Sequence, residues 1–131
     1  MNSRDLPIKL VLIVEDEPSI QVLLENMVRE QGLEPKCAPS GIDAITLIPA
    51  LKPDIILLDL MLPGMSGMQI LDMLRTGEFS KIPVIVLSGV SYQLAAKEKM
   101  ANYPNLIAVL SKPIVFTQFS EAIAQALKRL R

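Results

Sequence analysis

Four chemically active side chains stand at the ends of apolar runs of strand length, far apart in this 131-residue chain. The runs are LVLIVE before Asp16, IILLD ending in Asp59, VIVLS ending in Ser88 and LIAVLSK ending in Lys112. In an open parallel sheet the carboxyl ends of all strands meet at one edge. The spacing therefore predicts that the acids, the hydroxyl group and the lysine share one site.

A third carboxylate, Glu15, directly precedes Asp16. Three carboxylates in one crevice repel one another unless a cation or protons intervene. A site with oxygen ligands only, which leaves positions for water and phosphate, suits Mg²⁺. The run Glu15, Asp16 and Glu17 also has a purely structural explanation, because acidic residues favour a helix N-terminus. On the acids alone, both explanations stay open.

Ser88 and Lys112 also have structural explanations when each is taken alone. Ser88 precedes Gly89 and could cap a following helix, and Lys112 could be a solvated lysine before the turn residue Pro113. The order of acid pair, acid, hydroxyl and lysine–proline, each after a strand-like run, argues against coincidence. The combination indicates one functional site.

The elements that must position these residues alternate between strands and helices. LVLIV, IILL and VIVL are continuous apolar runs rich in β-branched residues, which is typical of strands buried on both faces of a parallel sheet. Apolar residues between the runs recur at helical spacing, as at Ile20, Leu23, Leu24, Met27 and Val28. We predict an α/β fold: a doubly wound (βα)5 domain whose five parallel strands carry helices on both faces.

Proline and glycine set the predicted boundaries. Asp16 opens the first helix, with Pro18 in its first turn, and Gly32 stops it. The second helix, 40–48, ends before Pro49, because proline inside a helix removes a hydrogen bond. The predicted strands are 9–14, 34–38, 54–58, 83–87 and 106–110, and the other helices are 67–76, 91–101 and 116–130.

Composition excludes several classes of protein. The chain has no histidine, which removes Ser-His-Asp and Cys-His catalysis and the commonest zinc ligand. The single cysteine, Cys37, cannot form an internal disulfide or a cysteine-rich zinc site, and we expect it to be a small apolar residue of the second strand. Catalysis or metal binding must therefore rely on oxygen ligands and lysine.

Charge and hydropathy limit the partners and the location. The net charge is −1, and the small basic cluster Lys128, Arg129 and Arg131 complements a helix C-terminus, so direct nucleic-acid binding is not supported. No apolar run reaches the roughly 18 residues of a membrane span, and no signal-peptide segment follows MNSRDLPIK. We expect a cytoplasmic protein without a membrane partner.

Four segments resemble the receiver domain of two-component response regulators: VLIVEDEPS, PDIILLDLMLPGMSG, IPVIVLSG and LSKP. The resemblance covers essentially the whole chain and implies a single receiver domain over 1–131, with a core of about 8–130. In the flavodoxin-like strand order 2-1-3-4-5 of that family, the first and third strands are neighbours at the topological switch point. That order would bring Glu15, Asp16 and Asp59 together.

The resemblance implies a magnesium site at these acids. Asp16 and Asp59 would bind Mg²⁺ directly, Glu15 would act on the metal through water, and the Met61 carbonyl would be a further ligand. Mn²⁺ is expected to substitute for Mg²⁺.

The resemblance also implies a phosphoacceptor. Asp59 would take a phosphoryl group from the phosphohistidine of a histidine kinase or histidine phosphotransfer protein, with Ser88 and Lys112 contacting that group. Phosphoryl transfer has a loose transition state, so positioning and charge neutralisation matter more than a strong nucleophile.

No enzymatic activity is expected beyond self-phosphorylation from small donors and self-dephosphorylation. The sequence names neither the kinase nor the downstream protein target, and the expected state is a monomer or weak homodimer.

Three positions bear on the signalling output or on its duration. The implied output face is helix 91–101 with strand 106–110 and helix 116–130. Three residues before the lysine, the family usually has tyrosine or phenylalanine, and this chain has Val109. A docking module or a phosphate shuttle without conformational output is therefore an alternative. The apolar residues Met61 and Val90, two positions past Asp59 and Ser88, predict slow self-dephosphorylation.

Two other classes fit less well. An aspartyl-nucleophile phosphatase of the haloacid dehalogenase type has a second acid two residues after the nucleophile, where this chain has Met61. A flavodoxin-like FMN carrier needs a phosphate loop after the first strand, where Glu15, Asp16 and Glu17 would repel phosphate.

Overall fold

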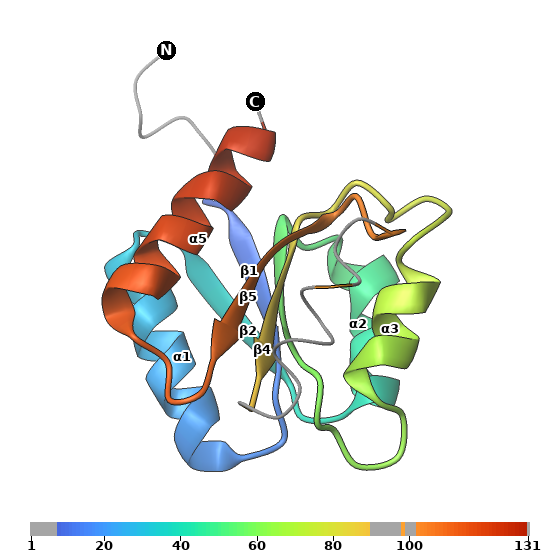
Figure 1. The fold of residues 1–131 in the computed structure, drawn as a ribbon, viewed down its shortest axis with the longest axis horizontal. Coiled ribbons are helices and arrows are strands. Elements are labelled where there is room, and N and C mark those ends of the chain that lie inside the picture. Colours follow the sequence, from blue (N-terminus) through green and yellow to red (C-terminus); the bar gives the residue numbers. More distant parts are fainter. Residues whose placement is uncertain (1–7, 90–97, 99–101, 131) are drawn as a thin grey trace.

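The computed structural model describes residues 8–89, 98 and 102–130, which form a sheet with helices on both faces (Figure 1). The strands are β1 (Leu10–Val14), β2 (Glu34–Ala38), β3 (Ile55–Asp59), β4 (Val84–Ser88) and β5 (Leu106–Ser111). The described helices are α1 (Pro18–Glu30), α2 (Gly41–Leu51), α3 (Gly67–Met73) and α5 (Phe116–Arg129). The predicted helix 91–101 falls almost wholly outside the described residues.

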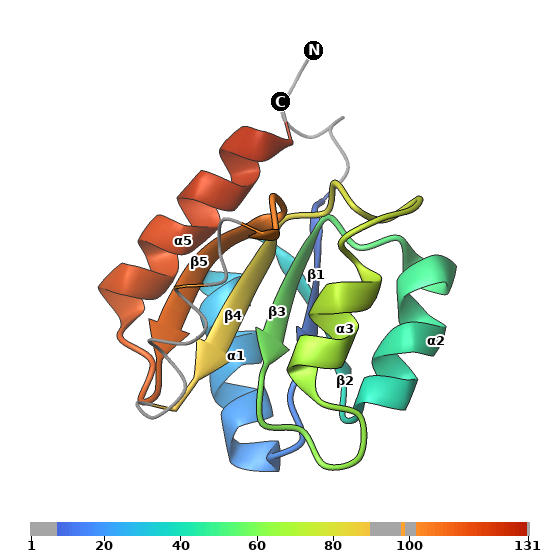
Figure 2. The same cartoon turned by 45° about the vertical axis from the view of Figure 1, so that its right-hand side comes forward.

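All strands are parallel, in the order β2-β1-β3-β4-β5, which confirms the predicted doubly wound fold. Figure 2 shows α1 and α5 on one face and α2 and α3 on the other. The central strand β3 pairs with β1 on one side and β4 on the other, so the carboxyl ends of all three meet. The acids after β1 and at the end of β3 therefore share one edge.

The core has two layers because successive strand residues point to opposite faces. Val11, Ile13 and Leu57 pack with α1 and α5, and Leu12 and Leu58 pack with α2 and α3. β3 and β4 are buried along their whole length, as the continuous apolar runs predict.

The start of α1 and the end of α2 differ from the predictions. α1 begins at Pro18 with Glu17 as its N-cap, so Asp16 lies outside the helix. α2 continues through Pro49 to Leu51, and the prediction that it ends at 48 is wrong. Pro49 lies in the last turn, where the missing N–H costs a single hydrogen bond, and Lys52 ends the helix with a left-handed φ of 48°.

The other differences are small, and two of them concern the strands that carry Asp59 and Ser88. α3 ends at Met73 and not at 76, because Leu74 closes it and a turn leads to Gly77, whose φ is 93°. β3, β4 and β5 each extend one residue further than predicted, to Asp59, Ser88 and Ser111. Asp59 and Ser88 are therefore held by the ladder of the sheet itself.

Candidate functional site

The loop from β1 to α1 carries two of the acids and is fixed by backbone contacts. The Glu15 N–H donates to the carbonyl of Ala38 at 3.1 Å, which continues the pairing of β1 with β2. The side-chain amide of Gln21, in the first turns of α1, donates to the Glu15 carbonyl at 2.6 Å. Sequence reasoning missed Gln21, since nothing in its type or spacing separates it from a surface residue.

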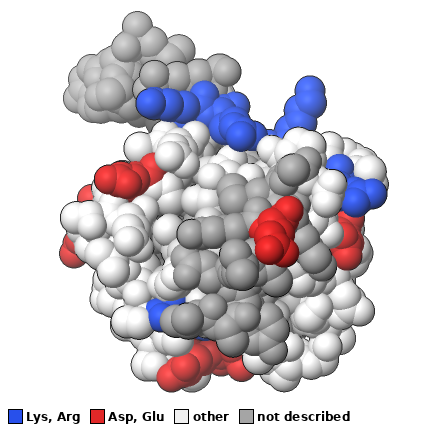
Figure 3. Space-filling model, in the orientation of Figure 1, with Lys and Arg blue, Asp and Glu red and all other residues white. Residues whose placement is uncertain are grey.

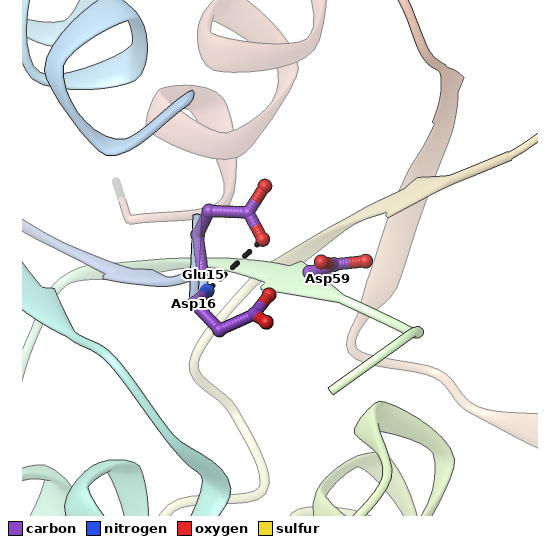
Figure 4. A group of neighbouring side chains, drawn as sticks. All are labelled: Glu15, Asp16 and Asp59. Carbon is purple, nitrogen blue, oxygen red and sulfur yellow. Dashed lines mark hydrogen bonds between the residues drawn. The ribbon is translucent and has the colours of Figure 1, made fainter. Parts of the chain in front are cut away.

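Three carboxylates meet at this edge. Ligand oxygens of Glu15, Asp16 and Asp59 all lie within 4.8 Å of one another, as the sequence predicted from the strand order. Figure 4 shows Glu15 and Asp16 leaving the end of β1 and Asp59 facing them from β3. Glu15 and Asp59 are buried and Asp16 is exposed. Three carboxylates that offer oxygen ligands, with Asp16 exposed to solvent, fit Mg²⁺, because this ion keeps several of its water ligands.

Lys112 bridges the two buried acids. Its Nζ lies 3.0 Å from Glu15 Oε1 and 3.1 Å from Asp59 Oδ2. The lysine follows the end of β5, where its N–H donates to the Ser88 carbonyl at 2.9 Å, and the Lys112–Pro113 peptide bond is cis. The cation that the sequence analysis placed at this edge therefore contacts the acids directly.

Burial and the shared lysine set the charge of the acids. Burial, followed by the neighbouring Asp59, raises the pKa of Glu15 to about 8. Burial acts to raise the pKa of Asp59 as well, but hydrogen bonds involving Glu15, the Met61 N–H and Lys112 outweigh it and hold that pKa below its usual range. Burial acts to lower the pKa of Lys112, and the two carboxylates reverse this and raise it. At neutral pH the pocket thus holds an ionised Asp59 beside a charged lysine.

Ser88 and Met61 occupy less direct positions. Ser88 is fully buried at the end of β4, and its Oγ has no hydrogen-bond partner among the described residues. A buried hydroxyl without a partner is costly unless something else binds it. The Met61 N–H donates to Asp59 Oδ1 at 2.9 Å, while its side chain is exposed. Val90, the residue two past Ser88, lies outside the described residues.

A close backbone approach holds the loop after Asp59. A Cβ atom built on Gly67 would lie 2.3 Å from the Asp59 carbonyl oxygen, so only glycine fits there. Gly64 has a φ of 75°, which also favours glycine. The two glycines let the loop turn back so that the Gly67 N–H donates to the Leu60 carbonyl at 3.2 Å.

The family model of the response regulator receiver domain matches residues 11–124. The chain belongs to this family. The DNA-binding response regulator MtrA of Mycolicibacterium smegmatis is 37% identical over 78 residues, which is 60% of this chain and 33% of that protein. The matched part therefore spans about a third of that curated relative.

Solved receiver domains share the fold over nearly the whole chain. The Francisella response regulator 1452 receiver domain is 25% identical, with a TM-score of 0.83, and the match covers 94% of this chain and 99% of that one. The signal receiver domain of a LuxO repressor protein from Vibrio parahaemolyticus is 30% identical, with a TM-score of 0.77 and coverages of 94% and 92%. The family match decides against the phosphatase and FMN-carrier alternatives.

Membership in this family gives the general function. Response regulators work in two-component signalling with histidine kinases, and their receiver domains are generally signalling modules without enzymatic activity that bind Mg²⁺ at an acidic pocket. Within the described part of the chain, no helix is both long enough and apolar enough to span a membrane.

Proposed function

We propose that Asp59 accepts a phosphoryl group from a phosphohistidine in a Mg²⁺-dependent reaction. The observation that carries this proposal is the position of Lys112 Nζ, 3.1 Å from Asp59 Oδ2, beside acids whose oxygens lie within 4.8 Å of one another. The donor is a histidine kinase or a histidine phosphotransfer protein, and the recipient of the signal is a further protein.

We propose a separate task for each acid of the pocket. Asp16 and Asp59 would hold Mg²⁺ directly, Glu15 would hold it through water, and the Met61 carbonyl would complete the protein ligands. The ion supplies positive charge to the phosphoryl oxygens when it is bound. Mn²⁺ takes the same oxygen ligands.

The chain's own residues position and neutralise the reacting group. An oxygen of Asp59 attacks phosphorus, the P–N bond to the donor imidazole breaks, and the ring nitrogen keeps the electron pair. The Met61 N–H at 2.9 Å orients the Asp59 carboxylate, and Lys112 balances the charge that spreads over the phosphoryl oxygens. The Ser88 hydroxyl, which has no partner among the described residues, is suited to donate to one of those oxygens.

The proposed output runs through the segment 91–101, β5 and α5. Val109 gives a specific reason to consider a second candidate, a phosphate shuttle without conformational output. Its side chain is half-buried in β5 against the core layer of α2 and α3, and it offers no large ring to reposition. Beryllofluoride, which mimics the phosphoryl group, separates the two. Amide shifts that spread over β5 and α5 support the switch, and shifts confined to the pocket support the shuttle.

Intact-mass analysis with acetyl phosphate tests the proposed function. Incubation with Mg²⁺ should add one phosphoryl group to the protein, and incubation with a metal chelator should add none. A chain that gains no mass with Mg²⁺ would be a docking module instead. We further propose a cytoplasmic protein that is a monomer or weak homodimer.

A further inference from the structure

The edge of the sheet opposite the acid site carries a second hollow, with a volume of about 250 Å³. It is lined by Ser80, Lys81, Pro104, Asn105 and Arg129. The first two of these residues precede β4, the next two precede β5, and Arg129 ends α5. The hollow therefore lies at the amino ends of the strands, away from Asp59 at the carboxyl end of β3.

The side chain of Asn105, which lines this hollow, is unusual for a buried amide. Its side chain is only 4% exposed, and neither Nδ2 nor Oδ1 has a hydrogen-bond partner among the described residues. Buried amides in native proteins are nearly always paired with protein, water or a ligand. Nδ2 needs an acceptor, which the cationic neighbours cannot supply, whereas Oδ1 can accept from a lysine or a water. Among the described residues Nδ2 has no acceptor, and an oxygen of a bound anion would satisfy it.

The other residues of the hollow supply donors and positive charge. Lys81 and Arg129 are both exposed, and Arg129 Nη1 donates to the Pro104 carbonyl at 2.9 Å, which holds the guanidinium at the rim. No acidic residue lines the hollow within the described ranges. Lys52 and Lys128 line the adjoining hollows, the first of which also contains Asp54 and Glu78, and Figure 3 shows lysine and arginine along this edge. An anion in this hollow would meet two cationic side chains and no carboxylate among the described lining residues.

We propose that this hollow binds a phosphate group, independently of the phosphoryl group at Asp59. The ammonium of Lys81, the guanidinium of Arg129, the Ser80 hydroxyl and the Asn105 amide together suit an anion with three or four acceptor oxygens better than a carboxylate with two. Asn105 lines the hollow, and binding would turn its buried amide toward the anion. Inorganic phosphate, a soluble phosphate monoester and a phospholipid headgroup share this chemistry.

An NMR titration with inorganic phosphate tests the proposal. A chelator is present so that no metal can bring phosphate to the acid pocket, and chloride keeps the ionic strength constant. The Asn105 side-chain NH₂ and the Arg129 Nε–H signals should shift in a saturable way. Lys81→Gln and Arg129→Gln should each weaken binding roughly tenfold, because each removes a charged hydrogen bond to the anion.

Lys128→Gln is the matched control, since it removes the same charge from the same end of α5 but outside the hollow. It should leave the affinity nearly unchanged. Equal losses in all three variants would mean diffuse attraction to the surface and would overturn the proposal, as would an Asn105 signal that does not respond. All three substitutions lie on the surface, and thermal melting verifies that each variant is folded.

Vesicles that contain phosphatidic acid, which carries a phosphate monoester, distinguish the sources of the group. If the hollow takes a lipid headgroup, the protein sediments with the vesicles, and both Arg129→Gln and added inorganic phosphate reduce this. If the vesicles are not bound while free phosphate is, the ligand is soluble. Vesicle binding that persists in Arg129→Gln would contradict a lipid role for the hollow.

Discussion

The two edges of the sheet hold their charges in opposite ways. At the carboxyl edge, Glu15 and Asp59 are buried and share the ammonium of Lys112. At the amino edge, Lys81 and Arg129 are exposed and line a hollow without a described acid. A buried charge needs a partner within the protein, whereas an exposed charge is stabilised by water. At the carboxyl edge the charge of Lys112 is thus already balanced by acidic side chains. At the amino edge Lys81 and Arg129 remain accessible to anions from solution.

The largest predicted effect comes from removing the lysine of the carboxyl edge. Lys112→Gln should slow labelling by acetyl phosphate roughly 100-fold, because the phosphoryl oxygens lose a preorganised cation. Lys81→Gln is the matched control: it removes the same charge from the opposite edge and should label at the wild-type rate. Intact-mass time courses give both rates. Equal slowing in the two variants would show that net charge, and not the pocket, controls the reaction.

The acids of the carboxyl edge should differ in their effect on the metal. Asp16→Ala should weaken Mg²⁺ binding by roughly tenfold or more, and Glu15→Ala by less, because a direct ligand loses more than a water-mediated one. Calorimetric titration of folded, unphosphorylated variants measures the affinities. If the wild type and both variants bind Mg²⁺ equally, the metal does not lie between these acids.

The lifetime of the phosphorylated pocket should depend on two apolar residues. The double variant Met61→Asn, Val90→Glu should release phosphate roughly tenfold faster than the wild type, because polar groups can orient an attacking water and apolar ones cannot. Release is followed after the donor is removed, in variants that still bind Mg²⁺. An unchanged or slower rate of phosphate release would show that these apolar residues do not slow hydrolysis.

The smallest effect concerns Cys37, whose Sγ donates to Glu25 Oε1 at 3.4 Å. Burial, and then the hydrogen bond to Glu25, raises the pKa of this thiol from 9.0 to about 12. In the pH window of about 9 to 12 the unfolded chain releases the proton and the folded chain keeps it. The thiol's contribution to stability is therefore present below pH 9 and lost as pH rises towards 12.

Alkylation with iodoacetamide measures the reactivity of this thiol. At pH 9 the folded protein should react a few-fold more slowly than the protein in urea, because only the thiolate attacks. Glu25→Gln should speed the reaction of the folded protein. Folded and unfolded chains that react alike would mean that the thiol is not perturbed.

Sequence patterns were sufficient for a parallel sheet, whereas the strand order that brings the acids together came from the resemblance to receiver domains. The continuous apolar runs reflect strands buried on both faces, and parallel strands must bring the ends of β1 and β3 to the same edge. The end of α2 was mispredicted, because a proline in the last turn costs little and Lys52 terminates the helix through its own φ. Local rules predict where a helix weakens but not how far it continues.

Other features depend on three-dimensional contacts that no local pattern encodes. The sequence predicted Lys112 near the acids but not that it bridges Glu15 and Asp59. The role of Gln21 depends on where the Glu15 carbonyl points once β1 ends. The Asn105 amide is buried beside the start of β4 without a partner among the described residues, which the residue type alone does not suggest.

Asp59 alone should carry the phosphoryl group, and mapping the position of the label tests this. After incubation with Mg²⁺ and acetyl phosphate, borohydride reduces an aspartyl phosphate to homoserine, which peptide mass spectrometry locates. Reduction is expected at residue 59 in the wild type and at no residue in Asp59→Asn. Homoserine at another aspartate, phosphate on Ser88, or equal labelling of Asp59→Asn would contradict it.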